Sequence, residues 1–243
     1  MSPGIAHAME KIPVLGSIIR VVTFERYEFE DDRHYAHVEI PKVESESEPA
    51  DEGMSQMNDK QQDMDPAISD STNKINREIT DYTASILNDF KSSLDEDTVK
   101  SLNIDYEVVT DTDTWFTLRL NILEIQGSGY QQSKYYHIDK ITGRQVTLAD
   151  LFEEDTEYIT IISENIKGQM RKQMEADEGK VYFLEGNDMS GGYFDTIEAD
   201  QDFYFNENGE IVIEFDEYEV APGYMGIVSF TIPKSVTEAL LKR

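Results

Sequence analysis

Apolar residues recur at every second position in some segments of this chain and at every third or fourth position in others. This change of period constrains the fold more than any single motif does. The clearest example is a hairpin in which 203–205 and 211–215 flank Asn208-Gly209, a dipeptide typical of tight turns between antiparallel strands. Residues 21–26 and 34–42 also alternate and predict a second hairpin. Further runs of this kind predict strands over 104–110, 114–125, 134–138 and 227–232.

Apolar residues three and four positions apart predict the helices. The first is expected through Ile5, Met9, Ile12 and Ile19, with Pro13 limiting its length. Other helical segments are expected after a cap at Ser69, Asp70 or Ser71 and running to Phe90, over 147–152, over 158–176 and at the C-terminus. Helices combined with mostly antiparallel strands predict an α+β fold, with the helices packed on the sheet in two subdomains of one compact unit.

The charge of the chain restricts its partners. It has 21 Lys and Arg against 50 Asp and Glu, a formal net charge of −29, which excludes ordinary nucleic-acid binding and favours a basic partner. There is no cysteine, so disulfides, zinc–thiolate sites and thiol nucleophiles are excluded. Residues 44–66 carry eight acids and one lysine, which predicts a solvated, mobile loop; the alternative is a cation-binding role.

The sequence contains no recognisable active site. His7, His34, His37 and His137 lack metal-ligand spacing, and His34 and His37 are expected on opposite faces of a strand. Asp111-Thr112-Asp113 starts like a calcium loop but lacks the later glycine and glutamate. No phosphate-binding loop or serine-nucleophile motif is present. We therefore expect a protein that is not an enzyme and needs no cofactor or metal.

Two segments suggest function. Ala6-His7-Ala8 before Met9 has the small-x-small pattern that signal peptidase accepts, although alanines at this spacing are also common in helices. Residues 218–226 join two expected strands, and Pro222-Gly223 favours a tight turn that would point Tyr224 outward. An exposed tyrosine in a rigid loop suits insertion into a partner's cleft. The alternative is that Tyr224 and Met225 fold back into the core.

The runs 2–16 and 20–24, together with 205–209 and 218–223, resemble the extracellular part of anti-sigma factors of the RsiV family from end to end. Residues 127–243 alone are also similar to a domain found beside peptidoglycan deacetylase modules. The resemblance divides the chain into a membrane-proximal cleavable segment, 1–22, an N-terminal subdomain, 23–126, with the acidic loop 44–66, and a C-terminal domain, 127–243.

The resemblance implies a single-pass membrane receptor that holds an extracytoplasmic-function sigma factor inactive through a cytoplasmic segment absent from this chain. Its extracellular part would bind and inhibit basic lysozyme of the animal type. Signal peptidase would then cut between Ala8 and Met9, with Ala6 and Ala8 in its small pockets, and an intramembrane protease would make the second cut. For lysozyme binding, the expected residues are Ala221, Pro222, Gly223, Tyr224 and Met225, joined by Tyr130 and Ser133 of a 127–133 loop.

Two other functions fit parts of the sequence. One is a peptidoglycan-associated domain, which incubation with cell wall and a search for released acetate or sugar would test. The other is a lysozyme inhibitor without a signalling role, which would have no reason to carry a signal-peptidase motif beside a membrane anchor.

Overall fold

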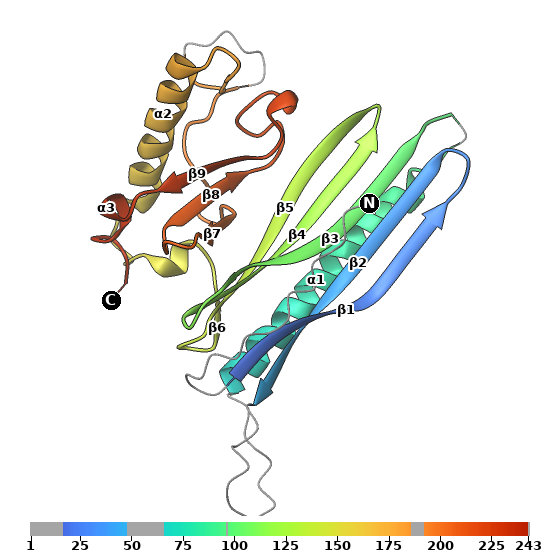
Figure 1. Ribbon diagram of the computed structural model, residues 1–243, viewed down its shortest axis with the longest axis horizontal. Coiled ribbons are helices and arrows are strands. Elements are labelled where there is room, and N and C mark those ends of the chain that lie inside the picture. The colour runs from blue at the N-terminus through green and yellow to red at the C-terminus, as the bar shows by residue number, and fades with distance from the viewer. Residues whose placement is uncertain (1–16, 48–65, 96, 186–191, 243) are drawn as a thin grey trace, which may run out of the picture.

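The computed structural model describes residues 17–47, 66–95, 97–185 and 192–242. The N-terminal lobe is a six-stranded sheet in the order β1-β2-β3-β4-β5-β6 with one long helix on it (Figure 1). Neighbouring strands are antiparallel except β2 and β3, which are parallel because α1 connects them. Its elements are β1 (Ser17–Glu30), β2 (His34–Ser47), α1 (Pro66–Ser92), β3 (Lys100–Asp111), β4 (Trp115–Gln126), β5 (Ser128–Asp139) and β6 (Arg144–Val146).

The first hairpin is longer than its alternation predicts. Ile19, expected in a helix, lies in β1 opposite Ser45, so the helical interpretation of that residue is wrong. The pairing also places 44–47 in β2 rather than in the acidic loop. Pairing with a neighbouring strand satisfies these backbone groups and overrides the local apolar spacing. The remaining residues of the expected first helix and of the loop, 1–16 and 48–65, lie outside the described residues.

Helix α1 covers one face of this sheet (Figure 1). Its apolar stripe, Ile75, Ile79 and Phe90, is buried against strand residues such as Val38, while Tyr82 and Ile86 pack at its margin. The predicted packing is therefore confirmed. The helix begins at Pro66, however, so Ser69, Asp70 and Ser71 lie within its first turns and do not cap it. Proline is well suited to a first helical position because its missing N–H needs no partner there.

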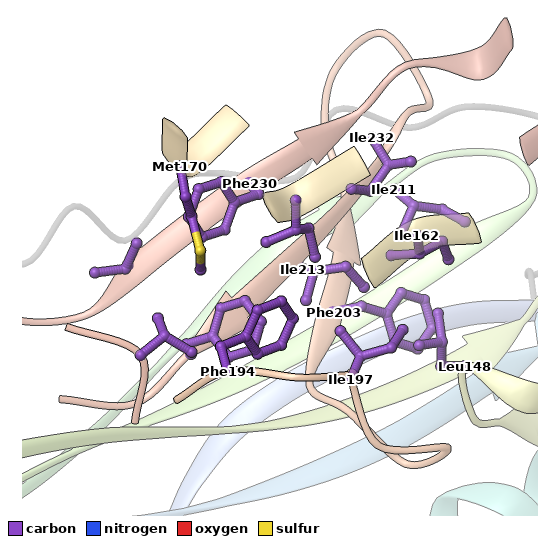
Figure 2. Packing of buried hydrophobic residues seen from close by; sticks show 14 of the residues in the cluster. Leu148, Ile162, Met170, Phe194, Ile197, Phe203, Ile211, Ile213, Phe230 and Ile232 are labelled. Atoms are coloured by element: carbon purple, nitrogen blue, oxygen red, sulfur yellow. The ribbon is translucent and has the colours of Figure 1, made fainter. Parts of the chain in front are cut away.

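The C-terminal lobe packs helices on a smaller antiparallel sheet, β7-β8-β9, which includes the predicted Asn208-Gly209 hairpin. Figure 2 shows its core, in which Ile162 and Met170 of one helix meet Ile213 and Phe230 of the strands. The α+β fold is confirmed by both lobes. The elements are η1 (Ala149–Leu151), α2 (Tyr158–Ala176), β7 (Phe203–Phe205), β8 (Ile211–Phe215), η2 (Gly223–Met225), β9 (Val228–Ile232) and α3 (Lys234–Thr237).

The sheets divide the chain later than the expected boundary at 126/127. β5 and β6 belong to the six-stranded sheet, so the C-terminal lobe starts after Val146. The lobes contact each other through polar and aromatic groups. Thr110 Oγ1 donates to the Phe205 carbonyl at 2.8 Å, and the rings of Trp115 and Phe205 stack with centroids 4.7 Å apart.

Gly143 is the turn residue at which we expect a substitution to be costly. Its φ of 70° is left-handed, and an added Cβ would lie 2.8 Å from Ile68 Cγ1 and 2.9 Å from the Ile68 backbone nitrogen. The Gly143→Ala variant should therefore unfold with a free energy lower by about 1–2 kcal/mol. Urea denaturation would measure this. A stability equal to that of the parent chain would contradict the close approach of α1 to this turn.

Candidate functional site

β8 and β9 are joined by residues 216–227, and we call 216–226 the tyrosine loop. Pro222 leads into the single turn η2. Tyr224 points to solvent, as the proline–glycine turn predicts, with 69% of its surface exposed. Its hydroxyl donates to the Gly179 carbonyl at 3.2 Å, which restrains the ring without burying it.

Tyr218 has an unusual backbone conformation within this loop. Its φ is 70°, and it is the one non-glycine residue with positive φ in the described part of the chain. For a tyrosine this conformation costs roughly 1–2 kcal/mol. The ring lies so close to Gly223 that a Cβ there would overlap its outer atoms. Tyr218 is half exposed, so two tyrosine rings flank Gly223 on the surface.

Neighbouring residues anchor the tyrosine loop to the lobe. Met225 packs against the C-terminal core, and its sulfur accepts a hydrogen bond from the Val181 N–H at 3.3 Å. Ala221 is buried, and its neighbour Val220 accepts from the Phe183 N–H at 2.8 Å. The side chains of Ala221 and Met225 therefore hold the loop in place, while Pro222, Gly223 and Tyr224 form its accessible tip.

Carboxylates of the C-terminal lobe also attach the tyrosine loop to the edge of β5. Glu217 Oε2 accepts from the Gln131 N–H at 2.8 Å, and the Glu217 N–H donates to the Gln131 carbonyl at 3.0 Å. Asp216 Oδ1 accepts from the Ser133 N–H at 2.9 Å, and Asp202 accepts from the next outward N–H, that of Tyr135. Three side chains thus occupy the backbone donors that a neighbouring strand would use.

Burial sets the protonation of these acids. It raises the pKa of Asp202 to about 6, although Lys134, whose Nζ lies 3.4 Å from Oδ1, acts in the opposite direction. Burial likewise raises the pKa of Asp216 to about 6 against the opposing hydrogen bond from Ser133. Both pKa values exceed the ordinary 3.8, so the folded chain holds these protons to a higher pH than the unfolded chain does. Each group therefore lowers the free energy of unfolding as pH rises from about 4 to about 6.

Tyr130 and Ser133 do not belong to a loop. Residues 128–133 form the first half of β5, because each is paired with β4, and only Gly127, with φ of 77°, makes the turn. Tyr130 is partly exposed at 38%. Ser133 is buried, and its Oγ has no hydrogen-bond partner. The expected 127–133 loop is therefore wrong, and Ser133 is placed to support the tyrosine loop through its backbone.

His34 and His37 lie in different surroundings. His34 is buried with Nδ1 2.9 Å from Asp31 Oδ2, whereas His37 is partly exposed, 3.7 Å from both Glu28 and Glu39. Within the described residues, no group of three or more His, Asp or Glu side chains could hold a metal ion. None of the helices described is long and apolar enough to cross a membrane. Ala6, Ala8 and Met9 lie outside the described residues.

The sequence drew attention to Tyr224, which stays a predicted binding residue, but gave no sign of Tyr218, Asp202, Asp216 or Glu217. A tyrosine four residues before Pro222 carries no signal of a left-handed backbone, since that conformation is usually adopted by glycine or asparagine. The three acids are hidden among 50 Asp and Glu residues. Only the packing of the two lobes shows that these three acids bind backbone N–H groups of β5.

A methyl group at Gly223 should disturb the tyrosine loop more than the fold. In Gly223→Ala the Tyr218 ring must move away, and it can do so because its far end is flexible and half exposed. We expect the free energy of unfolding to change by less than about 1 kcal/mol. NMR should show new chemical shifts for the Tyr218 and Tyr224 rings. Unchanged shifts would contradict the close packing of Tyr218 on Gly223.

The chain is similar in sequence or in fold to several known proteins. Residues 149–235 match a family described as a protein of unknown function, DUF3298. A DUF3298 protein of Bacteroides fragilis NCTC 9343 superimposes with a TM-score of 0.51 at 16% identity, covering 93% of this chain and 94% of that one. One from Pseudomonas aeruginosa PAO1 gives 0.55 at 13%, covering 95% of each chain. These likenesses show the fold.

The curated relatives carry the family assignment. The peptidoglycan-N-acetylmuramic acid deacetylase PdaC of Bacillus subtilis strain 168 is 23% identical, over 87% of this chain and 43% of the deacetylase. The anti-sigma-V factor RsiV of the same organism is 39% identical over 243 residues, which are 99% of this chain and 77% of that protein. By this identity over almost its whole length, the chain belongs to the RsiV family of anti-sigma-V factors.

Proposed function

We propose that this chain is the extracellular, lysozyme-sensing part of a membrane-anchored anti-sigma factor. It would bind a basic, animal-type lysozyme, inhibit it, and thereby become a substrate for signal peptidase. An intramembrane protease would follow, and the extracytoplasmic-function sigma factor held by the cytoplasmic part would be released. The anti-sigma role is supported by the family to which the chain belongs.

The observation that carries the lysozyme proposal is the tip of the tyrosine loop. Tyr224 is the most exposed large hydrophobic side chain among the described residues, yet its hydroxyl is hydrogen-bonded and the loop is tied to two lobes. A restrained aromatic side chain loses little entropy on binding. In our proposal Pro222, Gly223 and Tyr224 enter the substrate cleft of lysozyme, with Tyr130 at the margin and Ala221, Met225 and Ser133 as support.

Charge supports the choice of partner. The net charge of −29 would accelerate the approach of a basic protein, while the shaped tip supplies specificity. At physiological salt, attraction between exposed charges is screened beyond about 8 Å. A complex that survives gel filtration at that salt concentration would therefore depend on direct contact.

The proposed switch concerns the Ala8–Met9 bond, which precedes β1. Lysozyme binding would favour a state in which signal peptidase can bind this segment in an extended form. Changing a population from 1:99 to 99:1 requires a preference of about 5.5 kcal/mol for that state. A tight protein complex can supply such a preference, since a nanomolar Kd corresponds to about 12 kcal/mol.

Competition at the cleft tests the binding proposal. The chain is mixed with a basic animal lysozyme at physiological salt, with and without saturating tri-N-acetylglucosamine, which occupies the lysozyme cleft. We expect co-elution in its absence, dissociation in its presence, and loss of lysozyme activity on adding the chain. Co-elution that is insensitive to the sugar would place the contact outside the cleft.

A second experiment tests the switch. The membrane-anchored receptor and purified signal peptidase should give cutting after Ala8 only when lysozyme is added. Equal cutting without lysozyme would eliminate the gating step but would leave the binding proposal intact.

The distant deacetylase relative favours one alternative, a domain that binds peptidoglycan. Pull-down with purified cell wall distinguishes it, because the lysozyme-sensing proposal requires no retention there. Release of acetate in the same assay would indicate an enzyme.

A further inference from the structure

The six-stranded sheet has a second face, opposite α1, which we call the outer face. The C-terminal lobe covers part of it, where Tyr204 stacks on Tyr135 and Glu214 accepts a hydrogen bond from the Tyr135 hydroxyl at 2.8 Å. On this face, the residues of β1 from 26 to 30, of β2 from 35 to 39, of β3 from 101 to 107 and of β4 from 121 to 125 have only partly buried or exposed side chains. This uncovered area begins at the tyrosine loop.

The strand registers place one row of residues across this area. Gln131, Leu123, Asn103, His37 and Glu28 are successive partners on β5, β4, β3, β2 and β1. Gln131 is also where the tyrosine loop attaches: its backbone pairs with Glu217, and a Cβ at Gly226 would lie 3.4 Å from its Oε1. Four strand spacings of about 4.8 Å make this row about 19 Å long.

The adjacent row is more apolar. It runs from Ile125 through Ser101 and Tyr35 to Glu30. Tyr35 is 48% exposed and Ile125 is 40% exposed. The small Ser101 lies between them on β3, so the two larger side chains project on either side of it. Aromatic side chains such as that of Tyr35 are enriched at protein–protein interfaces.

The surrounding charges are acidic. Asp105 accepts hydrogen bonds from Asn103 at 3.1 Å and from Asn121 at 2.7 Å. Arg26 donates to Glu39 at 3.1 Å, and Arg119 is paired with Glu107, so these two arginines are already neutralised. Glu28 Oε1 lies 3.7 Å from His37 Nδ1, and within the described part of the chain Glu28, Glu30 and Asp105 have no lysine or arginine at ion-pair distance.

We propose that the outer face is a second contact surface for the basic protein that the tyrosine loop binds. This inference rests on the proposed function. The loop tip has three accessible residues, whereas a stable interface buries about 800 Å² on each partner and uses about 20–30 residues. The outer face is the uncovered area continuous with the loop. Its carboxylates would bind lysine or arginine side chains of the partner, and the Tyr35 ring would accept a cation on its face.

Two variants and a matched control test this surface by binding kinetics with a basic animal lysozyme. Tyr35→Ala removes the aromatic contact, and Glu28→Lys reverses one charge on the outer face. Asp81→Lys makes the same change of net charge on α1, at an exposed position on the opposite side of the sheet. Thermal unfolding of each variant checks that the fold is retained, as expected for exposed positions.

We expect Tyr35→Ala to weaken binding about tenfold, mainly through faster dissociation. Glu28→Lys should slow association about three- to tenfold at low salt, with a smaller effect at physiological salt, and Asp81→Lys should affect it clearly less. If the two charge reversals had equal effects and Tyr35→Ala bound like the parent chain, the outer face would not be a contact surface. Binding by the parent chain would still support the proposed function. No binding by the parent chain would overturn both.

Discussion

Replacing Tyr224 with alanine should lower the affinity for lysozyme by about 30- to 200-fold. The ring is the largest exposed group of the loop tip, and it is held by its hydrogen bond to Gly179. A central aromatic anchor of this kind contributes about 2–3 kcal/mol when truncated. Titration calorimetry at physiological salt measures the change. Inhibition of lysozyme should weaken by the same factor, because both readouts depend on occupation of the cleft.

Tyr193→Ala provides the control for this experiment. Tyr193 is also more than half exposed, but it lies outside the tyrosine loop, next to buried Phe194. Both variants should unfold at the temperature of the parent chain, since neither removes core contacts. If the two variants lowered affinity equally, or if Tyr224→Ala bound like the parent chain, Tyr224 could not be the anchor.

His137 should make the stability of the chain strongly dependent on pH. The residue is buried on the outer face of β5, where Thr117 Oγ1 lies 3.0 Å from Nδ1 and the Phe203 ring stacks at 4.1 Å. Burial, with a smaller contribution from Lys134, lowers its pKa from 6.5 to about 3. The unfolded chain therefore binds a proton that the folded chain excludes. The resulting stability is present above pH 6.5 and is lost as pH falls toward 3.

The His137→Gln variant isolates this contribution. Asp202 and Asp216 act in the opposite direction over nearly the same pH range, but they are present in both proteins and cancel in the comparison. The free energy of unfolding of the parent chain minus that of the variant should fall by about 1.4 kcal/mol for each pH unit below 6.5, or about 3 kcal/mol by pH 4. Urea denaturation at several pH values measures it. A difference that is constant with pH would contradict burial of a neutral imidazole.

Most of the secondary structure followed from local patterns. Helix α2 has the predicted bounds because its buried residues, Ile162, Ile166 and Met170, all lie at four-residue spacing. The β7–β8 hairpin was predictable because Asn208-Gly209 sets its turn, and Gly209 adopts the left-handed φ of 67° that the turn requires. In both cases the determining interactions span only a few residues.

Errors arose where distant pairing decides the structure. Ile19 has helical spacing to Ile12 and Leu15, but β2 offers it a strand partner in Ser45. A domain boundary was expected at 126/127, and nothing in the local sequence shows that β5 continues the sheet of β4 instead of starting a new one. Such pairings join residues that are distant in the sequence, so the periodicity of apolar residues cannot predict them.

The sequence by itself determined most of the strands and helices, the acidic charge and the turn at Pro222-Gly223, because backbone restriction and apolar spacing act over short distances. The structure decided that Tyr224 points outward and does not fold back into the core. Only the tertiary structure decided that Asp216 and Glu217 fasten this tip to β5 and that Tyr218 lies against Gly223. Only the strand registers bring Tyr35 and Glu28 onto one face with it. The contacts of Asp216 and Glu217 depend on how the two lobes pack, the position of Tyr218 on its left-handed backbone, and the shared face of Tyr35 and Glu28 on pairing between strands. None of these is visible in local apolar spacing.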